Sequence, residues 1–273
     1  MNIESTRMPA VFLGHGNPMN AIERNAFHES WARLGTLLPR PKAVLCISAH
    51  WEAPGVRVTS ARQPETIHDF YGFPEALFAV EYPAHGDPEL AQRVSALLHG
   101  HDVVLDSERG LDHGAWGVLS AMYPAAEVPV VQLSMDTRQS PQFHYDLAKK
   151  LAPLRDEGVL ILGSGNIVHN LRAFRYDDPA APGWAIEFNE AVKRKMSHGD
   201  HQALIDYRGL SEHVALAVPT IEHYLPLIYV LGVQDAQDEV EFMNDVVLST
   251  ISMTSLLISA PVFINALSAR LLL

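Results

Sequence analysis

Short apolar segments that lead into a histidine recur along this chain and constrain its fold more than any other feature. Residues 43–47 form an apolar run that is too short for a helix and rich in strand-forming residues, and His50 follows it closely. Similar apolar runs precede His15 and His169, each through a glycine-containing turn. Ligands of open α/β sheets gather outside the carboxyl ends of the strands. We therefore expect these histidines to meet in one pocket.

The composition is that of a globular protein with a large core. The chain has 273 residues, of which 48% are hydrophobic, and its formal net charge is −12. This negative charge disfavours partners such as nucleic acid or an anionic membrane surface. Cys46 is the only cysteine, so an internal disulfide is impossible and a reducing, cytoplasmic location is expected. Its position inside a predicted strand indicates a small buried residue rather than a nucleophile.

Neither end of the chain is expected to direct it into a membrane. The first residues include Glu4 and Arg7 and no long apolar segment, so we expect no signal peptide. Residues 246–269 carry no formal charge and are long enough to span a bilayer. Their many serine and threonine residues, together with Pro261 and Asn265, instead favour a final buried strand at 246–258 followed by an irregular tail.

Strand and helix patterns alternate along the chain, with no internal repeat and no linker. They predict one α/β catalytic domain over residues 1–273, with a central mixed or parallel sheet flanked by helices. Strands are expected at residues 9–13, 43–47, 56–59, 103–105, 128–133 and 159–162, and helices at 21–38, 115–123, 184–196, 203–207 and 222–231 and after the caps at 87 and 140. The proline-rich residues 63–88 are predicted to form a long loop, which is often the wall or lid of a site.

Most of the 14 histidines need no chemical role. Those on predicted helix faces or in polar turns are interpreted as solvated or structural: His28, His85, His99, His101, His144, His198, His201 and His213. His15, His50, His169 and His223 differ because each adjoins an apolar segment and a chain breaker. Three neutral imidazoles can bind Zn²⁺ or Fe²⁺ and leave coordination positions open. A set of hydrogen-bonded histidines at strand ends remains the alternative, since no pair has the spacing of a known short zinc motif.

Two further histidines are candidates for the same pocket. His113 follows Asp112, whose carboxylate could orient or charge it as a general acid or base requires. His68 lies among aromatic residues of the long loop. It either lines the mouth of the pocket or belongs to a small core within the loop.

Six short motifs, in this order, resemble those of the class III extradiol ring-cleavage dioxygenases of the 4,5-DOPA dioxygenase branch. They lie at residues 14–18, 48–51, 69–74, 112–114, 163–170 and 219–224. The resemblance runs from about residue 9 to residue 232. Residues 260–273 match nothing in that family and are interpreted as a divergent tail.

The resemblance implies a non-haem metal site. His15, His50 and His223 would be the ligands, and His169 would be an acid/base group or a fourth ligand when no substrate is bound. His113 would contact substrate or oxygen.

One ligand differs from the wider superfamily, in which the metal is held by two histidines and one glutamate. Glu222 stands beside His223 here, and we favour His223 as the ligand.

His68, Tyr71 and Trp51 are the expected substrate contacts.

The activity implied by the resemblance is the opening of a DOPA-like catechol ring by O₂, beside the diol. Fe(II) is the expected cofactor, and Zn(II) is possible as a bound ion. His169 would accept a catechol proton, and His113 would stabilise developing charge. The partners are a small aromatic diol and O₂, with no nucleic acid or membrane. Two other functions fit the same histidines: a zinc-dependent hydrolase, and a protein that binds a metal or small molecule without catalysis.

Overall fold

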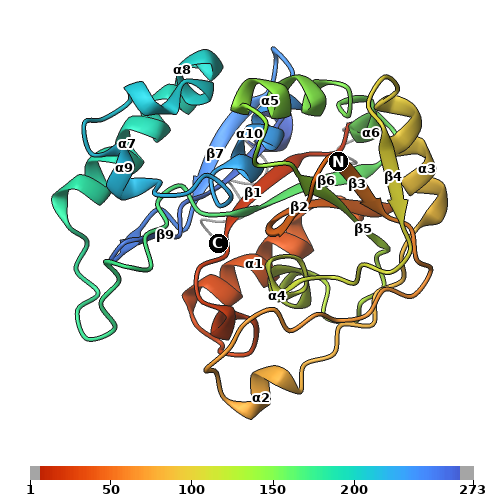
Figure 1. Ribbon diagram of the computed structural model, residues 1–273, viewed down its shortest axis with the longest axis horizontal. Coiled ribbons are helices and arrows are strands. Elements are labelled where there is room, and N and C mark those ends of the chain that lie inside the picture. Colours follow the sequence, from red (N-terminus) through yellow and green to blue (C-terminus); the bar gives the residue numbers. More distant parts are fainter. Residues whose placement is uncertain (1–6, 265–273) are drawn as a thin grey trace.

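A mixed eight-stranded sheet runs through the centre of the molecule (Figure 1). The computed structural model describes residues 7–264. The strands are β1 (Ala10–Gly14), β2 (Ala43–Glu52), β3 (Val56–Thr59), β4 (Val103–Asp106), β5 (Val130–Met135), β6 (Val159–Gly165), β7 (Glu239–Met243), β8 (Val247–Leu248), β9 (Ile251–Ser252) and β10 (Ser255–Ser259). Their order in the large sheet is β4-β3-β5-β2-β6-β1-β10-β7, and β8 and β9 form a separate hairpin.

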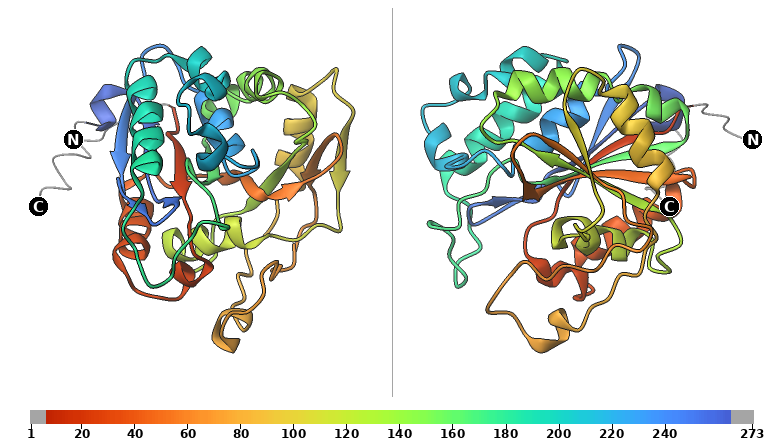
Figure 2. Two further views of the ribbon diagram at one scale, coloured as in Figure 1. Left: turned by 60° about the vertical axis from the view of Figure 1, so that its left-hand side comes forward. Right: turned by 45° about the vertical axis from the view of Figure 1, so that its right-hand side comes forward.

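Helices cover both faces of this sheet (Figure 2). The α-helices are α1 (Ala26–Leu37), α2 (Glu75–Phe78), α3 (Pro88–Leu97), α4 (His113–Met122), α5 (Pro141–Lys149), α6 (Pro153–Asp156), α7 (Gly183–Ser197), α8 (His201–Ile205), α9 (Val214–Ala217) and α10 (Leu225–Gly232). There are also two 3₁₀ helices, η1 (Pro18–Ala21) and η2 (Tyr207–Gly209). The predicted fold class, a single α/β domain with helices flanking a mixed sheet, is confirmed.

The sheet has an apolar core on each face, which explains why its central strands are continuous apolar runs rather than alternating ones. On one face, Leu13 of β1 packs in a cluster with Trp31 of α1 and Trp116 of α4. On the other face, Phe12 of β1 belongs to a cluster that includes Ile228 of α10.

Cys46 of β2 is fully buried in the first of these cores. Burial raises the pKa of its thiol well above the ordinary value, and the nearby Asp112 carboxylate adds to that rise. Cys46 therefore stays protonated and unreactive, as expected for a small apolar core residue.

Four neighbouring strands of the sheet, β5, β2, β6 and β1, are parallel. Strand β6 lies between β2 and β1, and its register places Ser164 opposite Ser48 of β2 and Gly165 opposite Gly14 of β1. Because parallel strands end at the same edge of a sheet, the residues that follow these positions are brought together.

Two element boundaries differ from the sequence-based expectations. The helix predicted at 21–38 begins only at Ala26, since the Asn25 side chain caps it by accepting hydrogen bonds from the backbone N–H groups of Phe27 and His28. Strand β2 continues to Glu52 through an irregularity in its register. His50 therefore lies within the end of that strand rather than beyond it.

The C-terminal region departs furthest from the prediction. The single strand expected at 246–258 is instead the β8–β9 hairpin followed by β10, and β7 was not predicted. Strands β10 and β7 pair antiparallel, beside β1. Residues 265–273 of the expected tail lie outside the described residues. Within residues 7–264, each helix is too short or too polar to cross a bilayer.

The long loop predicted at 63–88 is largely irregular, with only α2 and the start of α3 as helical structure. It descends below the sheet and returns to it (Figure 1). His85, within this loop, accepts a hydrogen bond at its backbone carbonyl from Val130 N–H of β5, which anchors the loop to the sheet.

One histidine that was expected to be solvated or structural is fully buried. His144 of α5 contacts the Asp136 carbonyl oxygen through Nε2 at 3.1 Å and the Tyr229 hydroxyl through Nδ1 at 2.9 Å. The carbonyl can only accept, so Nε2 carries the proton and Nδ1 accepts from Tyr229. Burial lowers the pKa of His144 to about 4, and its contacts with Asp136 only partly oppose this.

We expect His144 to make the fold less stable in acid. An unfolded histidine binds a proton below about pH 6.5, whereas folded His144 stays neutral until the pH approaches 4. The free energy of unfolding is therefore highest above pH 6.5 and falls as the pH drops from 6.5 toward 4. At pH 5 the loss from this residue is about 2 kcal/mol. Urea titrations at pH 7.5 and pH 5 measure it, and the His144→Gln variant should show a smaller difference between the two pH values. An equal difference in the variant would remove His144 as the cause.

Candidate metal centre

The carboxyl ends of β1, β2 and β6 place two of the candidate ligands side by side. His15 follows β1 directly, and its backbone N–H donates to the Gly165 carbonyl at 3.1 Å. His50 lies near the end of β2, two residues after Ser48. The Nε2 atoms of His15 and His50 are 3.2 Å apart. The sheet register therefore brings His15 and His50 together, as the sequence pattern predicted.

His223 reaches the same place from a different direction, on the turn that precedes α10. Its carbonyl oxygen accepts a hydrogen bond from Asn166 N–H at 2.9 Å, just after β6. A Cβ atom added to Gly165 would lie 2.2 Å from that oxygen. Glycine is required at this position because the two backbones pass too close for any side chain.

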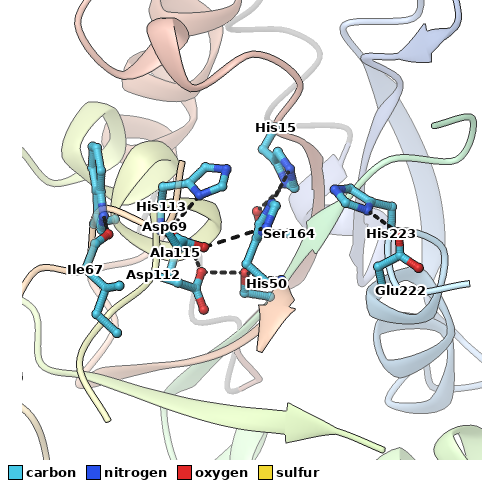
Figure 3. A network of polar contacts seen from close by, with 12 residues as sticks. His15, His50, Ile67, Asp69, Asp112, His113, Ala115, Ser164, Glu222 and His223 are labelled. Carbon is cyan, nitrogen blue, oxygen red and sulfur yellow. Dashed lines mark hydrogen bonds and ion pairs between the residues drawn. The ribbon is translucent and has the colours of Figure 1, made fainter. Parts of the chain in front are cut away.

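The three imidazoles form a cluster suited to a metal ion. One ligand nitrogen from each of His15, His50 and His223 lies within 4.8 Å of the other two. Figure 3 shows their rings converging on one space from separate elements. His15 and His223 are buried, and His50 is partly exposed toward the cavity.

The second ring nitrogens have partners that orient the rings. His15 Nδ1 lies 3.0 Å from Ser164 Oγ, and His223 Nδ1 donates to Glu222 Oε1 at 3.2 Å. This donation leaves the Nε2 lone pair of His223 free, and Nε2 is buried without a hydrogen-bond partner among the described residues. Metal-binding histidines are held in this way through their other nitrogen.

Electrostatics keep the imidazoles neutral. Burial lowers the pKa of His15 and of His223 well below the ordinary value, and neighbouring histidines lower it further. Burial also lowers the pKa of His50 to about 4, although the negative charges of Asp112 and Asp69 act in the opposite direction. Neutral imidazoles whose ring nitrogens gather in one space fit a divalent cation, and three such ligands leave coordination positions open.

Glu222 lies on the outer side of His223. It accepts from His223 Nδ1 and from the Thr220 hydroxyl, the latter at 2.8 Å. The geometry brings His223 rather than Glu222 together with His15 and His50, while Glu222 lies within 4.8 Å of His169 and His223.

His169 lies directly against His223. Their ring centroids are 3.4 Å apart and the rings are inclined by 7°, so they stack. Burial lowers the pKa of His169 to about 4, and Glu222 opposes the shift. His169 also lines the cavity above the three histidines. It is therefore placed to exchange a proton with a molecule bound there.

His113 is oriented by Asp69 and not, as expected, by Asp112. Asp69 Oδ1 accepts from the His113 backbone N–H at 3.0 Å and from Nδ1 at 2.8 Å, while Oδ2 lies 3.7 Å from His50 Nδ1. Burial alone would raise the pKa of Asp69, but the bonds from His113 outweigh it and the pKa falls to about 2. Sequence reasoning gave Asp69 no role, although it stands in one of the six motifs.

Asp112 instead supports His50 through the backbone. Asp112 is fully buried at the N-cap of α4, and its Oδ1 accepts from the Ser48 hydroxyl at 2.6 Å. Ser48 Oγ in turn accepts from the His50 backbone N–H at 3.2 Å. Gln132 and Arg109 donate to the other Asp112 oxygen at 2.8 and 3.2 Å. These contacts hold the irregular end of β2 in place.

A cavity of 370 Å³ opens above the histidines, which is the size of a site for a small molecule. His15, His50, His113, His169 and His223 line it. Aromatic side chains from the loops form much of the remaining wall.

The three expected substrate contacts are placed differently from one another. Tyr71 lines the cavity at its rim and is 91% exposed. His68 contacts the Val80 carbonyl through Nε2 at 2.9 Å and packs against Trp116, so it belongs to the loop core. Trp51 is buried beneath the Arg109 guanidinium. Neither His68 nor Trp51 is among the described residues that line the cavity, so the prediction that they contact substrate is not supported.

Comparison with known proteins decides the family. The family model for the catalytic LigB subunit of aromatic ring-opening dioxygenase matches residues 6–255. The chain belongs to this family.

Individual relatives agree with the family assignment. The chain is 47% identical over 93% of its length to a 4,5-DOPA dioxygenase extradiol of Escherichia coli, of which it covers 95%. It is 38% identical over 90% of its length to a protein of the same name from Beta vulgaris, of which it covers 94%. A crystal structure of an uncharacterized protein from Escherichia coli K12 has a TM-score of 0.82, 43% identity, and coverage of 93% of this chain and 100% of that chain.

The family assignment confirms the predicted class of enzyme. This LigB-family protein is an extradiol, aromatic ring-opening dioxygenase, and the family depends on a metal, which the histidine cluster fits. The alternative of a zinc hydrolase is not favoured, because the relatives and the family share dioxygenase names.

Proposed function

We propose that this protein uses Fe(II), held by His15, His50 and His223, to open the ring of a catechol with O₂ beside the diol. The observation that carries the proposal is the buried, unpartnered Nε2 of His223 beside the Nε2 atoms of two other neutral histidines. L-DOPA is the first candidate substrate, since several relatives are named 4,5-DOPA dioxygenase extradiol.

Iron suits this reaction better than zinc. A bound Fe(II) would supply the electron transfer between catechol and O₂, whereas Zn²⁺ has no redox chemistry. Zn²⁺ would fit the same three nitrogen ligands and could occupy the site as an inactive ion. A reducing compartment such as the cytoplasm suits both ferrous iron and the single thiol of Cys46, and we propose that location.

The remaining residues of the site would move protons and exclude water. His169 is neutral and lines the cavity, so it would accept a catechol proton and return it later in the reaction. Asp69 fixes the Nδ1–H tautomer of His113, which leaves Nε2 of His113 to contact substrate or oxygen. Phe70 packs edge-on against His113 and shields it from water.

Oxygen uptake tests this function directly. Protein loaded anaerobically with Fe(II) should consume O₂ when a catechol is added and should form a product with new visible absorption. Protein loaded with Zn(II) should do neither. Absence of turnover with unsubstituted catechol, L-DOPA and alkylcatechols alike would refute the proposal, and O₂-independent hydrolysis with Zn(II) would support the hydrolase instead.

A further inference from the structure

We infer that Asp69 is a positioning residue for two histidines at once: one carboxylate oxygen orients His113, and the other selects the metal-binding tautomer of His50. The contact between Asp69 and His113 uses only Oδ1. The inference concerns Oδ2, which lies toward the metal centre. It rests on the proposed function in one respect, since it takes His50 as a metal ligand.

The carboxylate of Asp69 lies within reach of two imidazole rings. Its Oδ1 accepts hydrogen bonds from the backbone N–H and from Nδ1 of His113, at 3.0 and 2.8 Å. Its Oδ2 lies 3.7 Å from His50 Nδ1, which is an ion-pair distance and longer than a hydrogen bond. The centroids of the two rings are 3.9 Å apart. One side chain of the long loop therefore faces both a candidate ligand and the histidine beside it.

His50 can bind a metal in the observed geometry in only one of its neutral tautomers. His50 Nε2 lies 3.2 Å from His15 Nε2, so these nitrogens face each other within the histidine cluster. A neutral imidazole binds a metal through the nitrogen that carries no proton. The proton of His50 must then be on Nδ1. A carboxylate can only accept, so Asp69 stabilises a proton at that position and favours the metal-binding tautomer.

The other contacts of His50 do not determine where its proton lies. Its backbone N–H donates to Ser48 Oγ at 3.2 Å, and its carbonyl oxygen accepts from Arg109 at 3.2 Å. Both contacts hold the backbone at the end of β2 and leave the ring nitrogens untouched. Among residues 7–264, Asp69 supplies the one carboxylate within ion-pair distance of His50 Nδ1. The choice of tautomer therefore falls to Asp69.

The same loop segment also supplies part of the cavity wall. Phe70 follows Asp69, lines the cavity and packs edge-on against His113, with 5.5 Å between ring centroids. His113 donates from Nδ1 to Asp69, which leaves its Nε2 without the proton. The segment thus brings a carboxylate and an aromatic side chain to the metal centre together.

A direct bond from Asp69 to the metal is the rival role. One ligand atom from each of His50, Asp69 and His113 lies within 4.8 Å of the other two. However, Asp69 Oδ1 already accepts two hydrogen bonds, and metal binding through His113 Nδ1 would break the shorter of them. The contacts therefore favour an orienting role for Asp69, and the size of the loss in metal affinity tests it.

Asparagine at position 69 separates the two roles of the carboxylate. Both His113 groups that contact Asp69 are donors, so the amide oxygen of the Asp69→Asn variant should stay on His113. Its NH₂ group then faces His50 Nδ1. Because NH₂ donates, it favours the tautomer with the proton on Nε2, which cannot bind metal there. Metal affinity should fall by about 10–100-fold, while the His113 tautomer is kept.

NMR of protein labelled with heavy nitrogen in its histidines reads the tautomers, and chelator competition with Zn(II) reads metal affinity. In metal-free protein, the His50 proton should lie on Nδ1 in the parent and on Nε2 in Asp69→Asn. Asp69→Ala should weaken metal binding and also mix the two tautomers of His113. Glu75→Gln is the matched control, since Glu75 is an exposed carboxylate of the same loop and its loss should change neither measurement.

Three results are decisive. An unchanged His50 tautomer and unchanged metal affinity in Asp69→Asn would overturn the inference. A loss of affinity well beyond 100-fold with an unchanged His50 tautomer would also overturn it, because Asp69 would then be a ligand. The predicted tautomer change and affinity loss would support it even if the metal-loaded parent turned over no catechol, in which case only the proposed reaction would fail.

Discussion

Replacing His223 by glutamine is expected to weaken metal binding by more than about 100-fold and to abolish ring opening. His223 supplies a buried Nε2 without a hydrogen-bond partner among the described residues, and Nδ1 is already bonded to Glu222. Loss of a partner that only orients a ligand costs about 10–100-fold in metal affinity, so loss of the ligand itself should cost more. Metal affinity is measured by competition with a chelator, and turnover by oxygen uptake.

Glu222→Gln is the matched control for this experiment. It keeps His223 in place and weakens the bonds that Glu222 accepts from His223 Nδ1 and from Thr220, so metal affinity should fall by about 10–100-fold while some turnover remains. If His223→Gln bound metal as tightly as the parent and Glu222→Gln did not, Glu222 would be the ligand. Far-ultraviolet circular dichroism of both variants shows whether the fold is retained.

Replacing His169 by alanine should also remove most of the turnover, but, unlike His223→Gln, it should leave most of the metal bound. His169 stacks on His223 and lines the cavity, but it is grouped with Glu222 and His223 rather than with His15 and His50. Loss of a general acid or base lowers turnover by about 10²–10⁴-fold. Metal content after dialysis and single-turnover rates with bound catechol measure the two effects.

The outcome for His169 also distinguishes its two possible roles. A fall in metal affinity as large as that of His223→Gln would make His169 a ligand. Unchanged turnover would remove it from the reaction. His144→Gln is a suitable comparison, because His144 is buried and is not among the residues that line the cavity, so its replacement should leave metal content unchanged.

The placement of His15 and His50 could be predicted from sequence because it depends on local pattern and sheet geometry. Apolar runs mark buried strands, and parallel strands bring their carboxyl ends together. The exact end of β2 could not be predicted, since it continues through an irregularity that only its neighbours define. His50 is held there by Ser48 and Asp112, residues 64 positions apart.

The side-chain contacts made by irregular segments could not be predicted from the sequence. Asp69 orients His113 across 44 positions of the chain, and no periodic pattern indicates which carboxylate in the long loop does so. His68 stands beside Asp69 but turns into the loop core, where Val80 and Trp116 contact it. The nearest carboxylate in sequence, Asp112, was the wrong partner for His113, because its side chain caps α4 and accepts from Ser48.

The C-terminal strands could not be predicted correctly from the sequence either. Residues 246–258 are apolar enough for one strand, but Asn244 and Ser249 adopt positive φ angles, at which the chain turns. β7 carries charged residues at Glu239 and Glu241 and is partly exposed, so its pattern is weak. Its pairing with β10 at the edge of the sheet depends on tertiary contacts.

The position of the metal tests the central claim most directly. Crystals of the Fe(II)-loaded protein, measured on both sides of the iron absorption edge, give an anomalous difference map that locates the ion. We predict one peak about 2.0–2.2 Å from a nitrogen of each of His15, His50 and His223, with at least one coordination position open to the cavity. A peak bound by other residues, or no peak within reach of all three imidazoles, would contradict the account.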